Sequence, residues 1–137
     1  MLPQVLIFLS AAMVLFLGTL HLVYTFASRK FSPRDAALED RLKLVSPVIS
    51  KQTTMWKAWI GFNASHSLGA MLFGALYGYF AIWHFQMLVQ DRFLALVGAA
   101  FLVSFLILAK RYWFNIPFAG IALSLVLYLA GFALTVV

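Results

Sequence analysis

The chain contains no cysteine among its 137 residues. Disulfides, thiolate metal sites, iron–sulfur clusters and thiol redox chemistry are therefore excluded. Charge is also scarce, since Asp, Glu, Lys and Arg make up 10% of the sequence, whereas a soluble domain has about 25%. No carboxylate lies inside any of the long apolar runs. This argues against a carrier that exchanges protons through a membrane-embedded acid and against hydrolysis by paired carboxylates.

Apolar residues fill most of the chain, which is 64% hydrophobic and 17% aromatic with a mean hydropathy of +0.97. A helix that crosses a bilayer needs about 20 such residues. The sequence therefore predicts an all-α integral membrane bundle of four transmembrane helices, in a single domain over residues 1–137. The four predicted spans cover residues 2–28, 56–83, 93–109 and 117–136.

Lys and Arg are unevenly distributed over the connections. Seven occur from Arg29 to Lys57, two follow span three, and Arg92 alone belongs to the opposite side. Because cytoplasmic loops carry an excess of Lys and Arg, this distribution of nine against one predicts that both termini are non-cytoplasmic. The loop over residues 29–55 is then cytoplasmic.

That loop also has a helical pattern. Ser32 and Pro33 suit an N-cap and the first position of a helix. The apolar residues that follow are spaced to share one face: Leu38, Leu42, Val45 and Ile49. We expect a short amphipathic helix at about residues 33–45 on the cytoplasmic surface, acting either as an interfacial connector or as a docking surface for a partner.

The basic character of the chain, with a net charge of +6 and a pI near 10.0, would suggest nucleic acid in a soluble protein. Here the cations flank apolar spans, where they meet anionic lipid headgroups. No soluble element carries a basic face with interleaved aromatic residues. The expected partner is the lipid bilayer, and no nucleic acid is expected.

Polar side chains inside the spans form the candidate site, because burying them costs free energy unless they find partners. His21 lies eight residues before Arg29, and His66 lies nine residues after Lys57. At about 1.5 Å per residue, both lie roughly 12–14 Å from the cytoplasmic boundary. Asn63 shares a helix face with His66. The predicted cluster, a ligand site or a polar packing contact, consists of His21, Thr25, Asn63, His66 and Ser67.

Three interpretations of this cluster remain open. The first is packing, in which each histidine is hydrogen-bonded to a neighbouring helix. The second is a polar anchor for a small lipophilic ligand such as a quinone or a lipid. The third is a b-type haem with His21 and His66 as axial ligands. Two histidines without a carboxylate or thiolate make a poor zinc site, so no metal ion and no catalytic residue are expected.

Small residues recur at a spacing of four, a pattern that lets helix backbones approach closely. Such stripes serve either the bundle itself or contact with another protein. The helix-packing candidates are Gly61, Ser65 and Gly69, then Ala70, Gly74 and Gly78, and in span four Gly120 and Ser124.

Two short runs, Gly18-Thr-Leu-His21 and Phe62-Asn-Ala-Ser-His-Ser-Leu-Gly69, together with the four-span arrangement, resemble small bacterial inner-membrane proteins such as the DoxX-like group. The resemblance implies a four-helix fold in a bacterial inner membrane and carries no single activity. With little mass outside the spans and no catalytic constellation, the chain is predicted to be a non-catalytic accessory or structural subunit. It would pack in a larger membrane complex or self-associate. The alternative is a redox or lipophilic-ligand protein that binds quinone, lipid or haem b at the His/Asn cluster.

Overall fold

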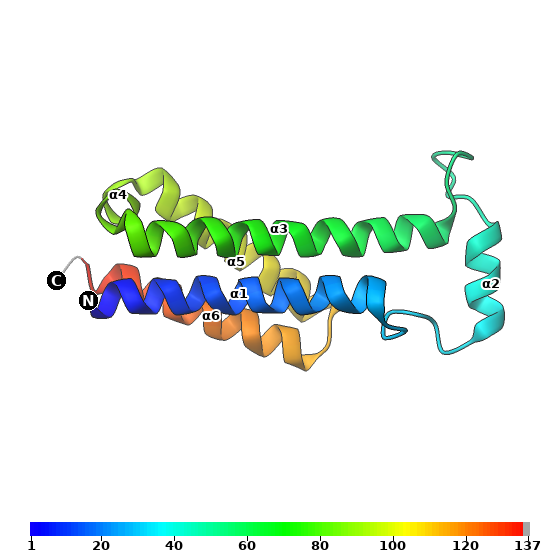
Figure 1. The fold of residues 1–137 in the computed structure, drawn as a ribbon, viewed down its shortest axis with the longest axis horizontal. Helices are drawn as coiled ribbons and strands as arrows, with labels where there is room; N and C mark the ends of the chain where they lie inside the picture. The colour runs from blue at the N-terminus through cyan, green and yellow to red at the C-terminus, as the bar shows by residue number, and fades with distance from the viewer. Residues whose placement is uncertain (136–137) are drawn as a thin grey trace. The chain divides into compact units, whose positions relative to one another are not determined.

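The computed structural model describes residues 1–135, and all of their regular secondary structure is α-helical (Figure 1). The predicted all-α class is thereby confirmed. The predicted end of span four at residue 136 lies outside the described residues. The helices are α1 (Leu2–Ala27), α2 (Ala36–Leu44), α3 (Met55–Trp83), α4 (Phe85–Gln90), α5 (Arg92–Tyr112) and α6 (Asn115–Ala133).

Three helices, α1, α5 and α6, are long and apolar enough to cross a membrane. In their most apolar windows, only 28%, 17% and 22% of the residues are buried. Most of the apolar side chains on these helices therefore face outward, where contact with water would be unfavourable. This surface is suited to a lipid bilayer and is compatible with a small membrane protein.

Helix α3 corresponds to the second predicted span, but within residues 1–135 it is not one of these three helices. Its 29 residues are more than enough to cross a bilayer. Its first half, however, carries Asn63, Ser65, His66 and Ser67, which lower its mean hydropathy. Four spanning helices therefore stay a prediction.

The chain divides into two compact units. Unit 1 comprises Met1–Leu17 and Ala70–Val137, and unit 2 comprises Gly18–Gly69. Helices α1 and α3 contribute to both units, α4, α5 and α6 belong to unit 1, and α2 belongs to unit 2. The assignment of the whole chain to one domain stays a prediction.

Unit 1 has an apolar core in which the largest fully buried hydrophobic side chains are Tyr128, Ile7, Leu88, Leu102 and Val14. Leu88 comes from α4, a short helix that the sequence did not predict. His84, with a non-helical backbone, separates it from α3. Asp91 then ends α4 and caps α5, because its Oδ1 accepts hydrogen bonds from the N–H groups of Phe93 (2.9 Å) and Leu94 (3.2 Å). The burial of Leu88 and the cap formed by Asp91 thus stabilise the turn between α3 and α5.

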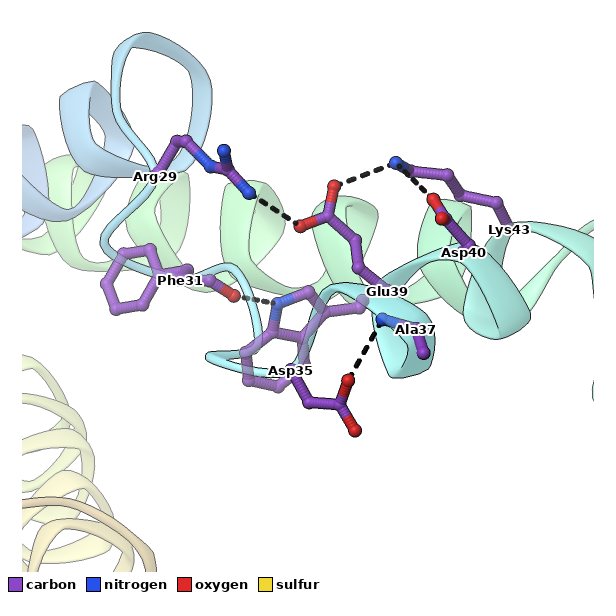
Figure 2. Close-up of polar contacts among 8 residues, drawn as sticks. Arg29, Phe31, Asp35, Ala37, Glu39, Asp40 and Lys43 are labelled. Atoms are coloured by element: carbon purple, nitrogen blue, oxygen red, sulfur yellow. Dashed lines mark hydrogen bonds and ion pairs between the residues drawn. The ribbon is translucent and has the colours of Figure 1, made fainter.

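In unit 2, the predicted start of the surface helix at residue 33 is wrong, since α2 begins at Ala36. Asp35 is the N-cap, and its Oδ1 accepts a hydrogen bond from the N–H of Ala37 at 2.9 Å (Figure 2). Ser32 does not cap the helix, because an Asp side chain stands directly before the first helical residue and provides a competing acceptor. None of the residues of α2 is buried, so its amphipathic contact with a surface stays a prediction.

Glu39 is the centre of the ion pairs around α2. Its Oε1 lies 2.8 Å from Nζ of Lys43, and its Oε2 lies 3.5 Å from a guanidinium nitrogen of Arg29 (Figure 2). The hydrogen bond from Lys43 and the charges of Lys43 and Arg29 lower the pKa of Glu39 below its ordinary value of 4.5. The same contact raises the pKa of Lys43.

A titration tests this arrangement. Because the pKa of Glu39 is lowered in the folded protein, its contribution to holding α2 is present above pH 4.5 and is lost as pH falls through the folded pKa. We expect the Glu39 carboxyl, followed by NMR, to titrate below pH 4.5 and to shift upward in Lys43→Gln. Arg41→Gln, on the same helix, should leave the midpoint unchanged. A midpoint at or above 4.5 in the unaltered chain would contradict the ion pair.

Candidate functional site

The residues predicted to form a polar cluster lie in unit 2, where the end of α1 meets the beginning of α3. The Nε2 atom of His21 lies 3.0 Å from Oδ1 of Asn63. The rings of His21 and His66 are in edge contact, with their centroids 5.2 Å apart and their planes at 64°. The structure therefore brings together His21 and His66, which the sequence placed at equal depth, and Asn63, which it placed on the same helix face as His66.

Within unit 2, the side chains of His21, Thr25, Asn63 and Ser67 form hydrogen bonds with protein groups. The Nδ2 atom of Asn63 donates to the carbonyl of Trp59 at 2.8 Å. Its Oδ1 is therefore the acceptor, and His21 donates to it from Nε2. Thr25 and Ser67 are buried, and each donates its hydroxyl to the carbonyl four residues earlier, on His21 and Asn63, at 2.8 Å. Among the described residues, no buried side-chain nitrogen or oxygen lacks a partner.

Aromatic residues that sequence reasoning did not assign to the cluster lie beside it. The ring of Phe31, just after α1, lies 4.4 Å from the ring of His21, centroid to centroid. The indole Nε1 of Trp59 donates to the carbonyl of Phe31 at 3.0 Å and fixes that segment. The ammonium of Lys30 lies 3.9 Å from the ring centroid of Tyr24. Phe31 directly follows two cations in the sequence, so the only signal for its inward position was its apolar character.

The geometry of the two histidines can be compared with what haem ligation requires. Axial ligands face each other across the porphyrin, with one ring nitrogen of each aimed at the iron. Here the two rings touch edge to face, and the Nε2 of His21 is engaged by Asn63. The arrangement does not match a bis-histidine haem site. Within residues 1–135, no group of three or more His, Cys, Asp or Glu side chains could hold a metal ion.

The small residues of unit 1 are used for close helix contacts. A Cβ atom on Gly74 would lie 2.6 Å from Cβ of Leu15, and one on Gly120 would lie 2.7 Å from Cδ1 of Leu17. Ala70 is buried, and Gly78 has ordinary contact with Ala11. At these positions α1 is the neighbour of α3 and of α6.

Ser124 is part of a contact that the sequence only half revealed. It is buried and exchanges hydrogen bonds with Ser10 of α1, which sequence reasoning missed. The hydroxyl of Ser10 donates to the carbonyl of Ser124 at 2.8 Å, and the hydroxyl of Ser124 donates to the carbonyl of Ser10 at 3.0 Å. A single serine in an apolar run, with no partner nearby in the sequence, gives no sign of this pairing.

The first stripe of small residues, in contrast, is open. A Cβ atom added to Gly61 or to Gly69 would meet nothing within 4 Å. Ser65 between them is exposed, and its hydroxyl donates only to the carbonyl of Phe62 at 3.1 Å. The same spacing of four therefore has two different uses in this chain: close contact in unit 1 and an uncovered face of α3 in unit 2.

Within residues 1–135, the fold and the cluster define a class: a helical protein with three helices able to cross a membrane and a polar cluster of histidine and asparagine. Comparisons with protein-family models, with curated proteins and with solved structures find no match for this chain. The function is therefore argued from the site and the surface of the chain itself.

Proposed function

We propose that this chain is a small integral membrane protein with four spanning helices and that it acts as a non-catalytic subunit in a larger membrane assembly. Both termini are non-cytoplasmic and the loop over residues 29–55 is cytoplasmic, in a bacterial inner membrane. The assignment of α3 as the fourth span determines this topology.

Charge supports the assignment of α3. If α3 crosses the bilayer, nine Lys and Arg side chains lie on one side and Arg92 alone lies on the other. If α3 does not cross, Arg92 joins the seven of the first loop, and the distribution falls to eight against two. The positive-inside rule therefore favours four spans. The hydrogen-bonded cluster of His21 and Asn63 also reduces the free energy needed to place these side chains in a bilayer.

The open stripe Gly61, Ser65 and Gly69 is the observation that carries the proposed role as a subunit. Small residues on a membrane helix allow another helix backbone to approach, and interfaces between membrane helices are enriched in them. In this chain the comparable positions Gly74 and Gly120 already have such neighbours, whereas a Cβ at Gly61 or Gly69 meets nothing. We infer that a helix of another subunit, or of a second copy, packs there.

The alternative is a lipophilic-ligand or haem protein that uses His21, Asn63 and His66. The hydrogen bonds of Asn63 favour packing over ligand binding, because this side chain uses both its oxygen and its nitrogen on protein partners. Under the packing interpretation, His66→Gln keeps the complex. Under the ligand interpretation, the same substitution removes a bound species.

The test is purification from the native membrane in mild detergent, followed by native electrophoresis and a visible spectrum. We expect a colourless complex larger than the single chain, retained in His66→Gln and dispersed by Gly61→Leu with Gly69→Leu. Ala100→Leu places a leucine on an exposed face of α5 and should leave the complex intact. A monomeric chain, or a haem spectrum that His66→Gln abolishes, would overturn the proposal.

A further inference from the structure

The connection between α2 and α3 is a closed loop with an aliphatic tip. The N–H of Met55 donates to the carbonyl of Val45 at 2.8 Å and closes the base of the loop. The N–H of Ser50 donates to the carbonyl of Pro47 at 3.2 Å, which places Val48 and Ile49 at the two central positions of a turn. Val48 is fully exposed and Ile49 is 92% exposed.

Such a tip is unusual in water. Turn positions are dominated by Gly, Asn, Asp and Ser, whose backbone or side chains suit a solvated bend. Two neighbouring β-branched aliphatic side chains at a turn instead expose apolar surface, and the removal of this surface from water is favourable. They do so within the most polar and most charged segment of the chain.

The position of the loop indicates what covers this tip. Within unit 2, the loop turns to the side of the first turn of α3 and does not extend beyond α2 (Figure 1). That turn of α3 carries Trp56, Lys57 and Trp59, residue types that mark the level of lipid headgroups. If α3 spans the bilayer, a loop beside this turn lies at the level of the headgroups, where lipid surrounds the helix.

The charges of the segment are complementary to an anionic surface. Its three carboxylates are engaged within the segment: Asp35 caps α2, Glu39 pairs with Arg29 and Lys43, and Asp40 lies 3.6 Å from Lys43 (Figure 2). The remaining cations have no carboxylate partner among residues 1–135. They include Arg34, Arg41, Lys51 and Lys57.

We propose that the 45–55 loop is a lipid-binding element that inserts Val48 and Ile49 at the boundary of headgroups and acyl chains, while Lys51 and its neighbouring cations bind the phosphates of anionic lipids. The proposal rests on the proposed function, because the loop reaches lipid only if α3 spans the bilayer. Apolar anchoring and electrostatic attraction act together in such interfacial elements.

The absence of cysteine allows a clean test with single labels. The Val48→Cys variant is labelled with an environment-sensitive fluorophore. It is placed in lipid nanodiscs of phosphatidylcholine, with and without phosphatidylglycerol. Asp40→Cys is the control on α2, at a side chain that is 75% exposed. Leu68→Cys, at a half-exposed position of α3, reports whether that helix lies in lipid. Quenching by acrylamide measures access from water, and quenching by spin-labelled lipid measures contact with acyl chains.

We expect the label at Val48 to be quenched by spin-labelled lipid and to be severalfold less open to acrylamide than the label at Asp40. Phosphatidylglycerol should strengthen this protection from acrylamide, and Lys51→Gln should weaken the effect of phosphatidylglycerol.

Equal access of acrylamide to the labels at Val48 and Asp40 overturns the proposal, and so does equal protection of the label at Val48 in neutral and anionic discs. Shielding without quenching by lipid also overturns it, since protein then covers the tip. If only the label at Leu68 is quenched by lipid, the spanning role of α3 stands and the loop proposal fails. If the label at Leu68 is not quenched, the four-span proposal itself fails.

Discussion

Gly74→Ala is expected to cause one of the largest losses of stability of any single substitution in this chain. A Cβ atom at Gly74 would lie 2.7 Å from the carbonyl oxygen of Ala11, 2.7 Å from the backbone nitrogen of Leu15 and 2.6 Å from its Cβ. Backbone atoms cannot turn away as a flexible side chain can, so α1 and α3 would have to separate at this point. Overpacking typically costs about 1–3 kcal/mol, and we expect the free energy of unfolding to fall by at least about 3 kcal/mol.

The matched control is Gly78→Ala, one turn further along the same stripe. There the nearest atom outside α3 is Cβ of Ala11 at 3.8 Å, an ordinary van der Waals distance. Replacing a helical glycine by alanine is favourable by about 0.5–1 kcal/mol when nothing obstructs the new methyl group. Denaturation in detergent micelles should therefore show Gly78→Ala at or above the unaltered chain. If Gly74→Ala also stays within about 0.5 kcal/mol of the unaltered chain, the close approach of α1 and α3 is wrong.

These two substitutions also show what the sequence could and could not predict. The spacing of four predicts that small residues share a helix face, and it gives the same prediction for Gly61 and for Gly74. The structure distinguishes the two positions. A Cβ atom added to Gly74 would collide with α1, whereas one added to Gly61 would meet nothing within 4 Å. Rotation of a helix about its axis is decided by the side chains of its neighbours, and a single sequence does not contain that information.

The polar cluster was easier to predict, because the depth of its two histidines in the predicted spans can be counted from the sequence. His21 and His66 stand at similar distances from Arg29 and Lys57, and charged residues mark the ends of spans. Counting residues inward therefore placed both rings at one level without any knowledge of rotation. The contact with Phe31 and the pairing of Ser10 with Ser124 depend on loop geometry and on a helix neighbour. Neither leaves a spacing pattern in the sequence.

Local chemistry explains the differences at the helix ends. Ser32 followed by Pro33 is a good start for a helix, but Asp35 offers a carboxylate to the N–H of Ala37 and takes the role of the cap. The break at His84 agrees with the predicted end of the second span at residue 83, although no glycine or proline marks it. What the sequence did not predict is the short helix α4 that follows the break and buries Leu88.

Gly98 should be as intolerant of alanine as Gly74, for a different reason. A Cβ atom there would collide with the hydroxyl of Tyr128 and lie 2.7 Å from both Cζ of Tyr128 and Cε1 of Tyr77. Tyr128 is 1% exposed and donates its hydroxyl to the carbonyl of Ala95 at 3.0 Å. Its ring cannot move without losing that bond and its buried position. Overpacking of about 1–3 kcal/mol and a lost buried hydrogen bond of about 1 kcal/mol together predict a loss of about 2–4 kcal/mol.

A double-mutant cycle identifies the colliding group. Tyr128→Phe alone should cost about 1 kcal/mol, the value of its hydrogen bond. In Gly98→Ala with Tyr128→Phe, the hydroxyl that meets the new methyl group is gone, so the combined loss should be smaller than the sum of the single losses by at least about 1 kcal/mol. The remaining contacts with Cζ of Tyr128 and Cε1 of Tyr77 make this rescue partial. Strict additivity would mean that Tyr128 does not lie against Gly98, and the packing of α5 against α6 would then be wrong at this point.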